Sequence, residues 1–261
     1  MTNENERAAP RVADAAQGAQ RLVVVSNRVP ALHRDAAAGG LASALSDALS
    51  ESGGLWFGWS GQESTDEEVR IVAHDGFELA TTDLTEDQLE RYYGRFANRV
   101  LWPLCHGRSD LSAYDQDDYA CYRAVNAELA RRLAPLLRAG DTVWVHDYHL
   151  IPMAGELRGL CPNLHIGFFL HIPVPETDLF RTLPCAGELI DDLSHYDLVG
   201  VQTEHDRGNL ERASERIAGS PSGPKSLRIA ACPIGIDADR FAEIAVSPRV
   251  QRLTRQFGTL L

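Results

Sequence analysis

The chain has 261 residues, of which 44% are hydrophobic and 24% are charged. These are ordinary values for a folded globular protein, and a chain of this length can hold a core without disulfides or metals. Its 25 Lys and Arg against 37 Asp and Glu give a net charge of −12. This acidic balance disfavours a nucleic-acid binder and attachment to an anionic membrane, because both need a basic face.

Five cysteines are spread widely through the chain, and none forms a C-x-x-C pair. Such an odd set predicts buried, unpaired thiols in a reducing cytoplasm. They are Cys105, Cys121, Cys161, Cys185 and Cys232. Residues 1–20 are rich in Ala and in charge, which predicts a disordered leader rather than a secretory signal. Because no run of about 18 apolar residues occurs either, we expect a soluble cytoplasmic protein.

Short apolar runs mark the predicted strands in chain order. A continuous apolar run suits a strand that is buried on both faces, as in a parallel sheet. Four runs of this kind lie at residues 22–25, 143–145, 166–170 and 198–201. Three further runs, at residues 55–59, 69–73 and 77–81, lie around turns and predict antiparallel structure at an edge.

Segments with a helical period lie between these runs. Apolar positions from Tyr119 to Leu136 keep one face of a helix, and we expect Gly140 to end it. Thr85 and Thr203 each begin a capping-box pattern, which predicts a helix start. Strands that alternate with helices predict right-handed βαβ units and an α/β fold with a doubly wound parallel sheet.

Polar residues directly follow each of the four long apolar runs. Ligands of open α/β sheets bind beyond the carboxyl ends of the strands, where loops and helix starts meet. The residues at these ends are Asn27-Arg28, 146–149, His171 and Gln202-Thr203. We expect them to form one polar site on an apolar sheet.

Gly39 and Gly40 precede a segment of good helix propensity. Glycines at a helix start let backbone N–H groups approach a phosphate, and the helix dipole favours its negative charge. Arg28 strengthens this interpretation, because a guanidinium binds phosphate through two parallel hydrogen bonds. On composition alone, Arg28 fits a surface arginine equally well. The only lysine, Lys225, lies in a Gly/Pro loop and excludes a P-loop.

The segment His146-Asp147-Tyr148-His149 has two interpretations. One is a metal site, although no second group of His, Asp or Glu shows a standard ligand spacing. The other has both histidines packed and hydrogen-bonded, leaving Asp147 to accept from a substrate hydroxyl. His171 is either structural or part of the site. The lack of G-x-S-x-G and G-x-G-x-x-G patterns disfavours an α/β-hydrolase and a dinucleotide site.

The middle of the chain is rich in aromatic residues. Aromatic faces stack on the C–H surfaces of sugars, but core packing is the default explanation for any one of them. These residues are Trp56, Trp59, Tyr92, Tyr93 and Trp102. Together with the polar strand ends, they predict a protein that binds a small phosphorylated, polyhydroxylated ligand.

These segments occur in the order seen in the trehalose-6-phosphate synthase family, which the chain resembles from about Arg21 to about Asp239. The matching segments are LVVVSNR (22–28), GGL (39–41), LWFGWSG (55–61), YY (92–93), VLWP (100–103), VWVHDYHL (143–150), IGFFLHIP (166–173), GVQTE (200–204) and PIGID (233–237). So many ordered motifs make the resemblance specific.

The resemblance implies a retaining glycosyltransferase with two Rossmann-like domains, the GT-B architecture. The family transfers glucose from UDP-glucose to glucose 6-phosphate, giving trehalose 6-phosphate and UDP, and its site needs no metal or cofactor. Residues 1–20 would be the leader, 21–245 the N-terminal acceptor-binding domain, and 246–261 part of the helix that links the two domains.

The same resemblance implies roles for individual residues in binding the acceptor. Arg28 and Tyr93 would bind the phosphate of glucose 6-phosphate, and Asp147 the sugar hydroxyls. His171 would lie near the reacting glucose, where a donor to the oxygens of the reaction lowers the barrier electrostatically. The family is usually described as reacting by front-face substitution, so no side-chain nucleophile is expected.

Four further residues would shape the two substrate sites. Gly39 and Gly40 would approach the diphosphate of the donor. Trp102 and Ile172 would line the acceptor pocket and set its preference for one anomer.

The chains of this family continue for about as much sequence again, and that part supplies most of the donor site. We therefore expect this polypeptide alone to be inactive or nearly so, and to need a C-terminal domain or a homo-oligomer. Two alternatives stay open: a glucosylglycerol-phosphate synthase, which uses glycerol 3-phosphate as acceptor, and a non-catalytic phosphosugar-binding half.

Overall fold

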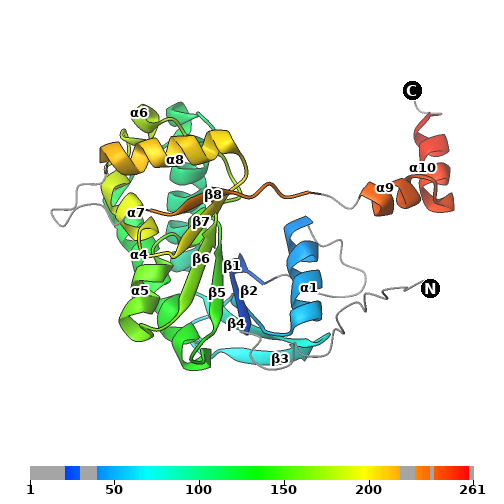
Figure 1. The fold of residues 1–261 in the computed structure, drawn as a ribbon, viewed down its shortest axis with the longest axis horizontal. Helices are drawn as coiled ribbons and strands as arrows, with labels where there is room; N and C mark the ends of the chain where they lie inside the picture. Colours follow the sequence, from blue (N-terminus) through cyan, green and yellow to red (C-terminus); the bar gives the residue numbers. More distant parts are fainter. Residues whose placement is uncertain (1–20, 30–39, 218–226, 236–237, 259–261) are drawn as a thin grey trace, which may run out of the picture. The chain divides into compact units, whose positions relative to one another are not determined.

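The computed structural model describes residues 21–29, 40–217, 227–235 and 238–258 (Figure 1). The expected leader (1–20), the glycine Gly39 and the Gly/Pro loop around Lys225 lie outside the described residues. The chain falls into two compact units, Met1–Ala231 and Cys232–Leu261. The first unit ends with the last strand of the sheet, whereas our predicted boundary stands at residue 245.

One eight-stranded sheet forms the first unit, in the order β3-β4-β2-β1-β5-β6-β7-β8. Every neighbouring pair is parallel except β3 and β4. The strands are β1 (Leu22–Arg28), β2 (Leu55–Glu63), β3 (Arg70–His74), β4 (Phe77–Leu84), β5 (Thr142–His146), β6 (His165–Phe169), β7 (Leu198–Val201) and β8 (Ile229–Ala231). The four long apolar runs are thus confirmed as parallel strands.

The prediction of an antiparallel edge is correct for β3 alone. A tight turn at Asp75-Gly76, with φ of 39° and 92°, joins β3 to β4 and forces the two strands to run in opposite directions. β2 instead follows β1 through a helix, and this crossover makes it parallel to β1.

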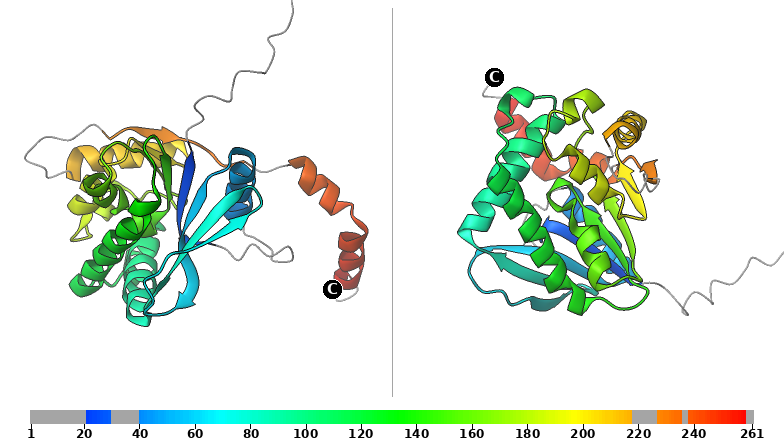
Figure 2. Two further views of the ribbon diagram at one scale, coloured as in Figure 1. Left: turned by 90° about the horizontal axis from the view of Figure 1, so that it is seen from below. Right: turned by 90° about the vertical axis from the view of Figure 1, so that its left-hand side faces the viewer.

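The helices of the first unit cover both faces of the sheet (Figures 1 and 2). They are α1 (Gly40–Ser52), α2 (Glu86–Gln88), α3 (Trp102–Cys105), α4 (Gln116–Leu133), α5 (Met153–Leu160), α6 (Thr177–Phe180), α7 (Ala186–Leu193) and α8 (Glu204–Ile217). A π-helix, η1 (Leu89–Leu101), and three 3₁₀ turns, η2 (Ser109–Leu111), η3 (Ala134–Leu136) and η4 (Tyr148–Leu150), complete the set.

Successive side chains of β1 point to opposite faces of the sheet, and the core accordingly consists of two clusters, one on each face. Val24 packs with Leu45 and Leu49 of α1 on one face. Val23 and Val25 pack on the other face, with the apolar sides of η1, α4, α5, α7 and α8. Because successive side chains of a strand point to opposite faces, a strand buried on both faces needs a continuous apolar run.

The helix predicted to extend to Gly140 ends earlier, at Leu133. Pro135 lacks a backbone N–H, so it cannot continue the hydrogen bonding of α4, and the chain tightens into η3. Gly140 instead adopts a φ of 86° in the turn before β5. Both predicted capping boxes do begin helices, at Thr85 before α2 and at Thr203 before α8.

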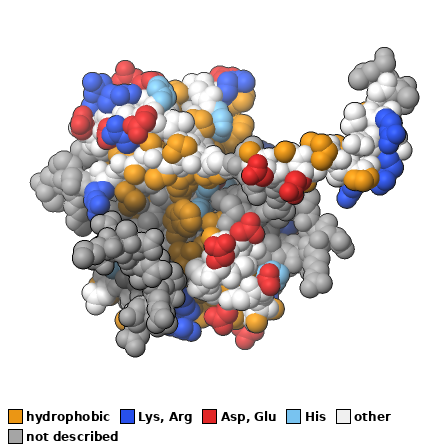
Figure 3. Space-filling model, turned by 45° about the vertical axis from the view of Figure 1, so that its right-hand side comes forward, with side chains coloured by type: hydrophobic (Ala, Val, Ile, Leu, Met, Phe, Trp, Pro, Cys, Tyr) orange, Lys and Arg blue, Asp and Glu red, His pale blue; other side chains and the backbone are white. Residues whose placement is uncertain are grey.

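The second unit contains α9 (Ala238–Ala245) and α10 (Pro248–Gly258). Phe241, Val246 and Phe257 are between 60% and 69% exposed. Figure 3 shows apolar side chains and basic ones along this segment. Within the described ranges, no helix is both long enough and apolar enough to cross a membrane.

Candidate functional site

The candidate site lies at the carboxyl ends of β1, β5 and β6. The chain progresses from β1 toward β2 on one side and continues from β5 toward β8 on the other, so the direction of winding changes between β1 and β5. Ligands of open α/β sheets bind at such a switch point. It brings together the residues that end these strands: Arg28, His146, Asp147 and His171.

Arg28 ends β1 and presents an exposed guanidinium. Its Cζ lies 5.4 Å from the centre of the Trp59 ring. It also lies against Gly61, where a Cβ would be only 2.7 Å from Nη2 of Arg28. The guanidinium makes no ion pair or hydrogen bond with the residues that the structure describes. Its donors are therefore held in place and available to an anion.

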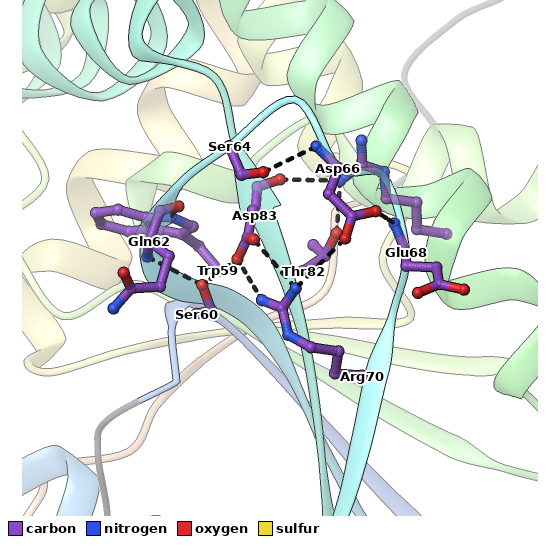
Figure 4. Close-up of polar contacts among 10 residues, drawn as sticks. Trp59, Ser60, Gln62, Ser64, Asp66, Glu68, Arg70, Thr82 and Asp83 are labelled. Carbon is purple, nitrogen blue, oxygen red and sulfur yellow. Dashed lines mark hydrogen bonds and ion pairs between the residues drawn. The ribbon is translucent and has the colours of Figure 1, made fainter.

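The end of β2, which carries Trp59 and Gly61, is anchored by a cluster of charged and polar groups (Figure 4). Asp83 of β4 accepts hydrogen bonds from Ser60 Oγ and from Arg70 of β3. The bond to Arg70 contributes most to holding the pKa of Asp83 below its usual value. Arg132 of α4 donates to the backbone oxygen of Asp83 at 2.9 Å. These bonds connect the end of β2 with β3, β4 and α4. We call this end of β2, with Trp59 and Gly61, the platform for Arg28.

Tyr93 projects from η1 and is 37% exposed, unlike its buried neighbour Tyr92. The Tyr93 ring lies 6.4 Å from the ring of Trp59 and 5.5 Å from that of His149, and it stacks on the latter. Five residues further along η1, Asn98 accepts a hydrogen bond of 2.8 Å from the Tyr148 hydroxyl. A chain of side chains thus connects Arg28 with the residues after β5.

Asp147 has an unusual backbone, with φ of 77° and ψ of 163°. This region is otherwise almost restricted to glycine, and such strain is typical of functional sites. Hydrogen bonds secure it: its N–H donates to the oxygen of Phe169 at 2.8 Å, and its Oδ1 accepts from the N–H groups of Tyr148 and His171 at 3.1 and 3.2 Å.

The electrostatic setting of Asp147 follows from its burial. Burial raises the pKa of this carboxyl to about 6, although the two backbone N–H groups act in the opposite direction. No described residue donates to Oδ2 of Asp147. That oxygen can accept from a ligand hydroxyl.

Three buried or half-buried imidazoles, those of His146, His149 and His171, belong to the same strand ends as Asp147. His146 Nδ1 lies 3.0 Å from Nε2 of His171. Burial lowers the pKa of His146 and of His149 to about 3 and that of His171 to about 4. All three are therefore neutral at pH 7.

One of our two interpretations had both histidines after β5 packed and hydrogen-bonded. Both are packed, but only His146 has a hydrogen-bonded ring. Both nitrogens of His149 are buried without a hydrogen-bond partner among the described residues. Its ring stacks between aromatic neighbours instead. In the described part of the chain, no three His, Cys, Asp or Glu residues are placed to hold a metal ion.

The structure separates the aromatic residues that composition could not distinguish. Trp56 and Tyr92 are buried in the core, and their polar atoms bond to Ser26 and Asn27 of β1. Trp102 is 44% exposed. Asn27 and Trp56 therefore have structural roles.

The remaining predicted residues lie close in sequence to the site, but no described contact joins them to it. Gly40 begins α1, as the helix-start interpretation requires. Trp102 begins α3 and stacks on His106, with 4.1 Å between ring centres. Ile172 follows His171 and packs against the core. Thr203, at the end of β7, accepts from the N–H of Asp206 and so caps α8.

Sequence reasoning missed two contributors to the site. Gly61 leaves room for the guanidinium of Arg28. From the sequence, a glycine within a strand indicates only that some other group lies close to the backbone, and it does not identify that group. Asn98 reaches Tyr148 because η1 is a π-helix. In an α-helix, residues five apart such as Tyr93 and Asn98 do not lie on one face. Nothing in the sequence therefore indicated that both would lie on the same side of this helix.

The fold defines a Rossmann-like α/β protein. At the switch point of its sheet lie a buried carboxyl and a guanidinium that is unpaired among the described residues. A sequence profile of glycosyltransferase family 20 matches residues 20–260, and the chain belongs to this family. The trehalose-6-phosphate synthase of Sinorhizobium fredii is 47% identical over 239 residues, which cover 86% of this chain and 52% of that protein.

Solved structures agree with this assignment. The chain is similar to an α,α-trehalose-phosphate synthase (UDP-forming) from Burkholderia vietnamiensis, with a TM-score of 0.85, 41% identity, and coverage of 93% of this chain and 56% of that one. It is also similar to such an enzyme from Burkholderia xenovorans, solved in complex with glucose-6-phosphate (TM-score 0.81, 40% identity, coverage 90% and 55%). The expected GT-B type of α/β fold is confirmed. The chain spans about half the length of these relatives.

Proposed function

We propose that this chain forms the acceptor-binding half of a UDP-glucose-dependent retaining glycosyltransferase that transfers glucose to glucose 6-phosphate. The observation that carries the proposal is the unpaired guanidinium of Arg28, connected to the carboxylate of Asp147 through a series of contacts. These contacts pass through Trp59, Tyr93, His149 and Tyr148. An anion-binding group at one end and a hydroxyl acceptor at the other match a sugar phosphate.

Each group suits its part of the acceptor. The guanidinium of Arg28 and the hydroxyl of Tyr93 donate to phosphate oxygens, and Oδ2 of Asp147 accepts from a sugar hydroxyl. Aromatic rings between the two ends offer faces for the C–H surface of a sugar. The relative from Burkholderia xenovorans that was solved with glucose-6-phosphate supports this choice of ligand.

Further roles follow from the family. His171 lies beside Asp147 and donates to an oxygen of the transferred glucose or its leaving group, which stabilises charge in the transition state. Trp102 and Ile172 border the acceptor pocket, and Gly39 and Gly40 approach the donor diphosphate at the start of α1. The site works with neither a metal nor a cofactor.

We infer that UDP-glucose binds mainly through groups in the part of these relatives that this chain does not cover. The chain alone then binds the acceptor weakly and transfers glucose slowly or not at all. A C-terminal domain, or a second copy of the chain, would supply the remaining wall of the cleft. The spread of unpaired cysteines favours a cytoplasmic location.

A calorimetric titration of glucose 6-phosphate into the chain and into Arg28→Ala tests the acceptor site. Loss of one partner of a desolvated charge pair costs about 2–4 kcal/mol. We therefore expect saturable binding by the parent and none measurable by the variant, with the free energy of unfolding unchanged. Arg138→Ala is the matched control, because it removes the same charge from the exposed turn at the amino end of β5.

Other outcomes identify the alternatives. Equal binding by the parent and by Arg28→Ala refutes the role of Arg28. Binding of glycerol 3-phosphate in preference to glucose 6-phosphate indicates a glucosylglycerol-phosphate synthase. Tight binding of glucose 6-phosphate, with no UDP released from UDP-glucose after a C-terminal half from a relative is added, indicates a non-catalytic phosphosugar-binding half.

A further inference from the structure

The side chains of His146 and His171 are in contact, and one proton must lie between their two facing ring nitrogens. The question is which of the two imidazoles carries it. His146 ends β5 and His171 lies in the loop after β6, and their rings stack at an angle of 24° with 5.3 Å between centres. Nδ1 of His146 is 3.0 Å from Nε2 of His171. Between two neutral imidazoles, one of these nitrogens must donate and the other accept.

The two possible arrangements differ in what they leave buried. If His171 donates from Nε2, then His146 accepts at Nδ1 and carries its own proton on Nε2. That nitrogen is buried and has no hydrogen-bond partner among the described residues. Buried N–H groups without an acceptor are rare and costly. If His146 donates from Nδ1, its Nε2 carries only a lone pair, and no N–H of this residue is orphaned.

The second arrangement also determines the state of His171. Its Nε2 then accepts, so its proton must sit on Nδ1. The backbone N–H of His171 already donates to Asp147. Nδ1 of His171 makes no hydrogen bond with the described residues, and the side chain is half-buried rather than enclosed. Its N–H is free to meet a ligand.

We propose that His146 is a positioning residue, which donates from Nδ1 to Nε2 of His171 and so holds His171 in the tautomer with its proton on Nδ1. The tautomer follows from the contact between two neutral rings and from the burial of Nε2 of His146. Its use as a donor to a sugar or phosphate oxygen rests on the proposed function. Burial keeps the pKa of both imidazoles well below neutrality, which agrees with two neutral rings that share one contact.

Long-range proton–nitrogen NMR correlations of the chain labelled with ¹⁵N-histidine report the tautomer of each imidazole directly. Spectra of His171→Gln and His165→Gln assign the signals, the latter serving as the control at an exposed position. We expect His171 in the form protonated on Nδ1, whereas imidazole side chains in water prefer Nε2. In His146→Leu, His171 should revert to the Nε2 form.

A second variant keeps the test valid if leucine prevents folding. His146→Asn retains an amide N–H near the position of Nδ1, so it should preserve the Nδ1 form of His171. Protonation of His171 on Nε2 in the parent chain overturns the proposal, as does an unchanged tautomer in folded His146→Leu. No sugar phosphate is present in these samples, so a failure of glucose 6-phosphate to bind is a separate result.

Discussion

Asp147 shows how much of the site depends on one residue held in an unfavourable state. Its backbone lies in a region that costs a non-glycine residue about 1–3 kcal/mol, and burial raises the pKa of its carboxyl to about 6. Hydrogen bonds from Tyr148 and His171 compensate part of this cost. A residue that destabilises the fold in this way, at the switch point of the sheet, is better explained by function than by packing.

Asp147→Asn should therefore stabilise the protein above pH 6. A raised pKa means that the folded state favours the protonated carboxyl, so the penalty grows as pH rises from about 4 and is complete above about 6. The amide stays neutral and still accepts from both N–H groups. We expect urea unfolding at pH 7.5 to show a gain of about 1–3 kcal/mol, fading toward pH 4. A variant less stable than the parent at pH 7.5 contradicts this account.

At the scale of elements, the end of β2 acts as a platform for Arg28. Gly61 has a φ of 90° and no side chain, so the guanidinium can lie against its Cα, and the Trp59 ring centre lies 5.4 Å from Cζ of Arg28. The bonds of Ser60 and Arg70 to Asp83 hold this segment against β3 and β4 (Figure 4). The neighbours of the Arg28 guanidinium on this platform, Trp59 and Gly61, are uncharged.

Gly61→Ala tests the platform and leaves Arg28 in the sequence. The new Cβ would lie within 3.0 Å of the guanidinium and displace it, so we expect affinity for glucose 6-phosphate to fall at least about tenfold, or 1.4 kcal/mol. Gly140→Ala is the matched control, because its φ of 86° imposes similar strain and nothing lies within 4 Å. Both variants should lose about 1–2 kcal/mol of stability. Equal affinity in the two variants excludes the platform role.

At the scale of the molecule, the site concentrates buried titratable groups at one edge of an otherwise apolar sheet. His146, His149 and His171 each have a pKa far below the usual value of 6.5. The unfolded chain therefore binds protons below pH 6.5 that the folded chain does not, and each group costs up to about 1.4 kcal/mol per pH unit. Asp147 acts in the opposite direction between about pH 6 and 4.

The free energy of unfolding should thus decline by up to about 3 kcal/mol per pH unit as pH falls from 6 to 4.5. His149→Phe should reduce this slope by about 1.4 kcal/mol per pH unit, because phenylalanine keeps the ring contacts with Tyr93 and Tyr148 and cannot be protonated. Urea unfolding at several pH values measures the slope, with His165→Phe on the exposed end of β6 as the control. An unchanged slope in His149→Phe is inconsistent with a buried neutral imidazole.

Local pattern was sufficient for most of the architecture. The strands that were predicted from apolar runs, β1, β5, β6 and β7, are confirmed. The prediction works because a strand that is buried on both faces must be apolar throughout. Four polar strand ends were expected to form one site. Direct contacts join the ends of β5 and β6, whereas Arg28 after β1 is connected to them only through aromatic side chains and Thr203 after β7 caps α8. The end of α4 was misplaced, although Pro135 carried the signal that stops it.

The sequence by itself determined the class of fold, the family and the set of strand-end residues, because these depend on short-range periodicity and ordered motifs. Only the tertiary structure decided which aromatic rings are core, that Gly61 admits the guanidinium of Arg28, and that His146 contacts His171. Each of these depends on contacts between segments far apart in the chain. Burial is set by what the fold places around a side chain, so the shifted pKa values of Asp147 and the histidines could not be read from neighbouring residues.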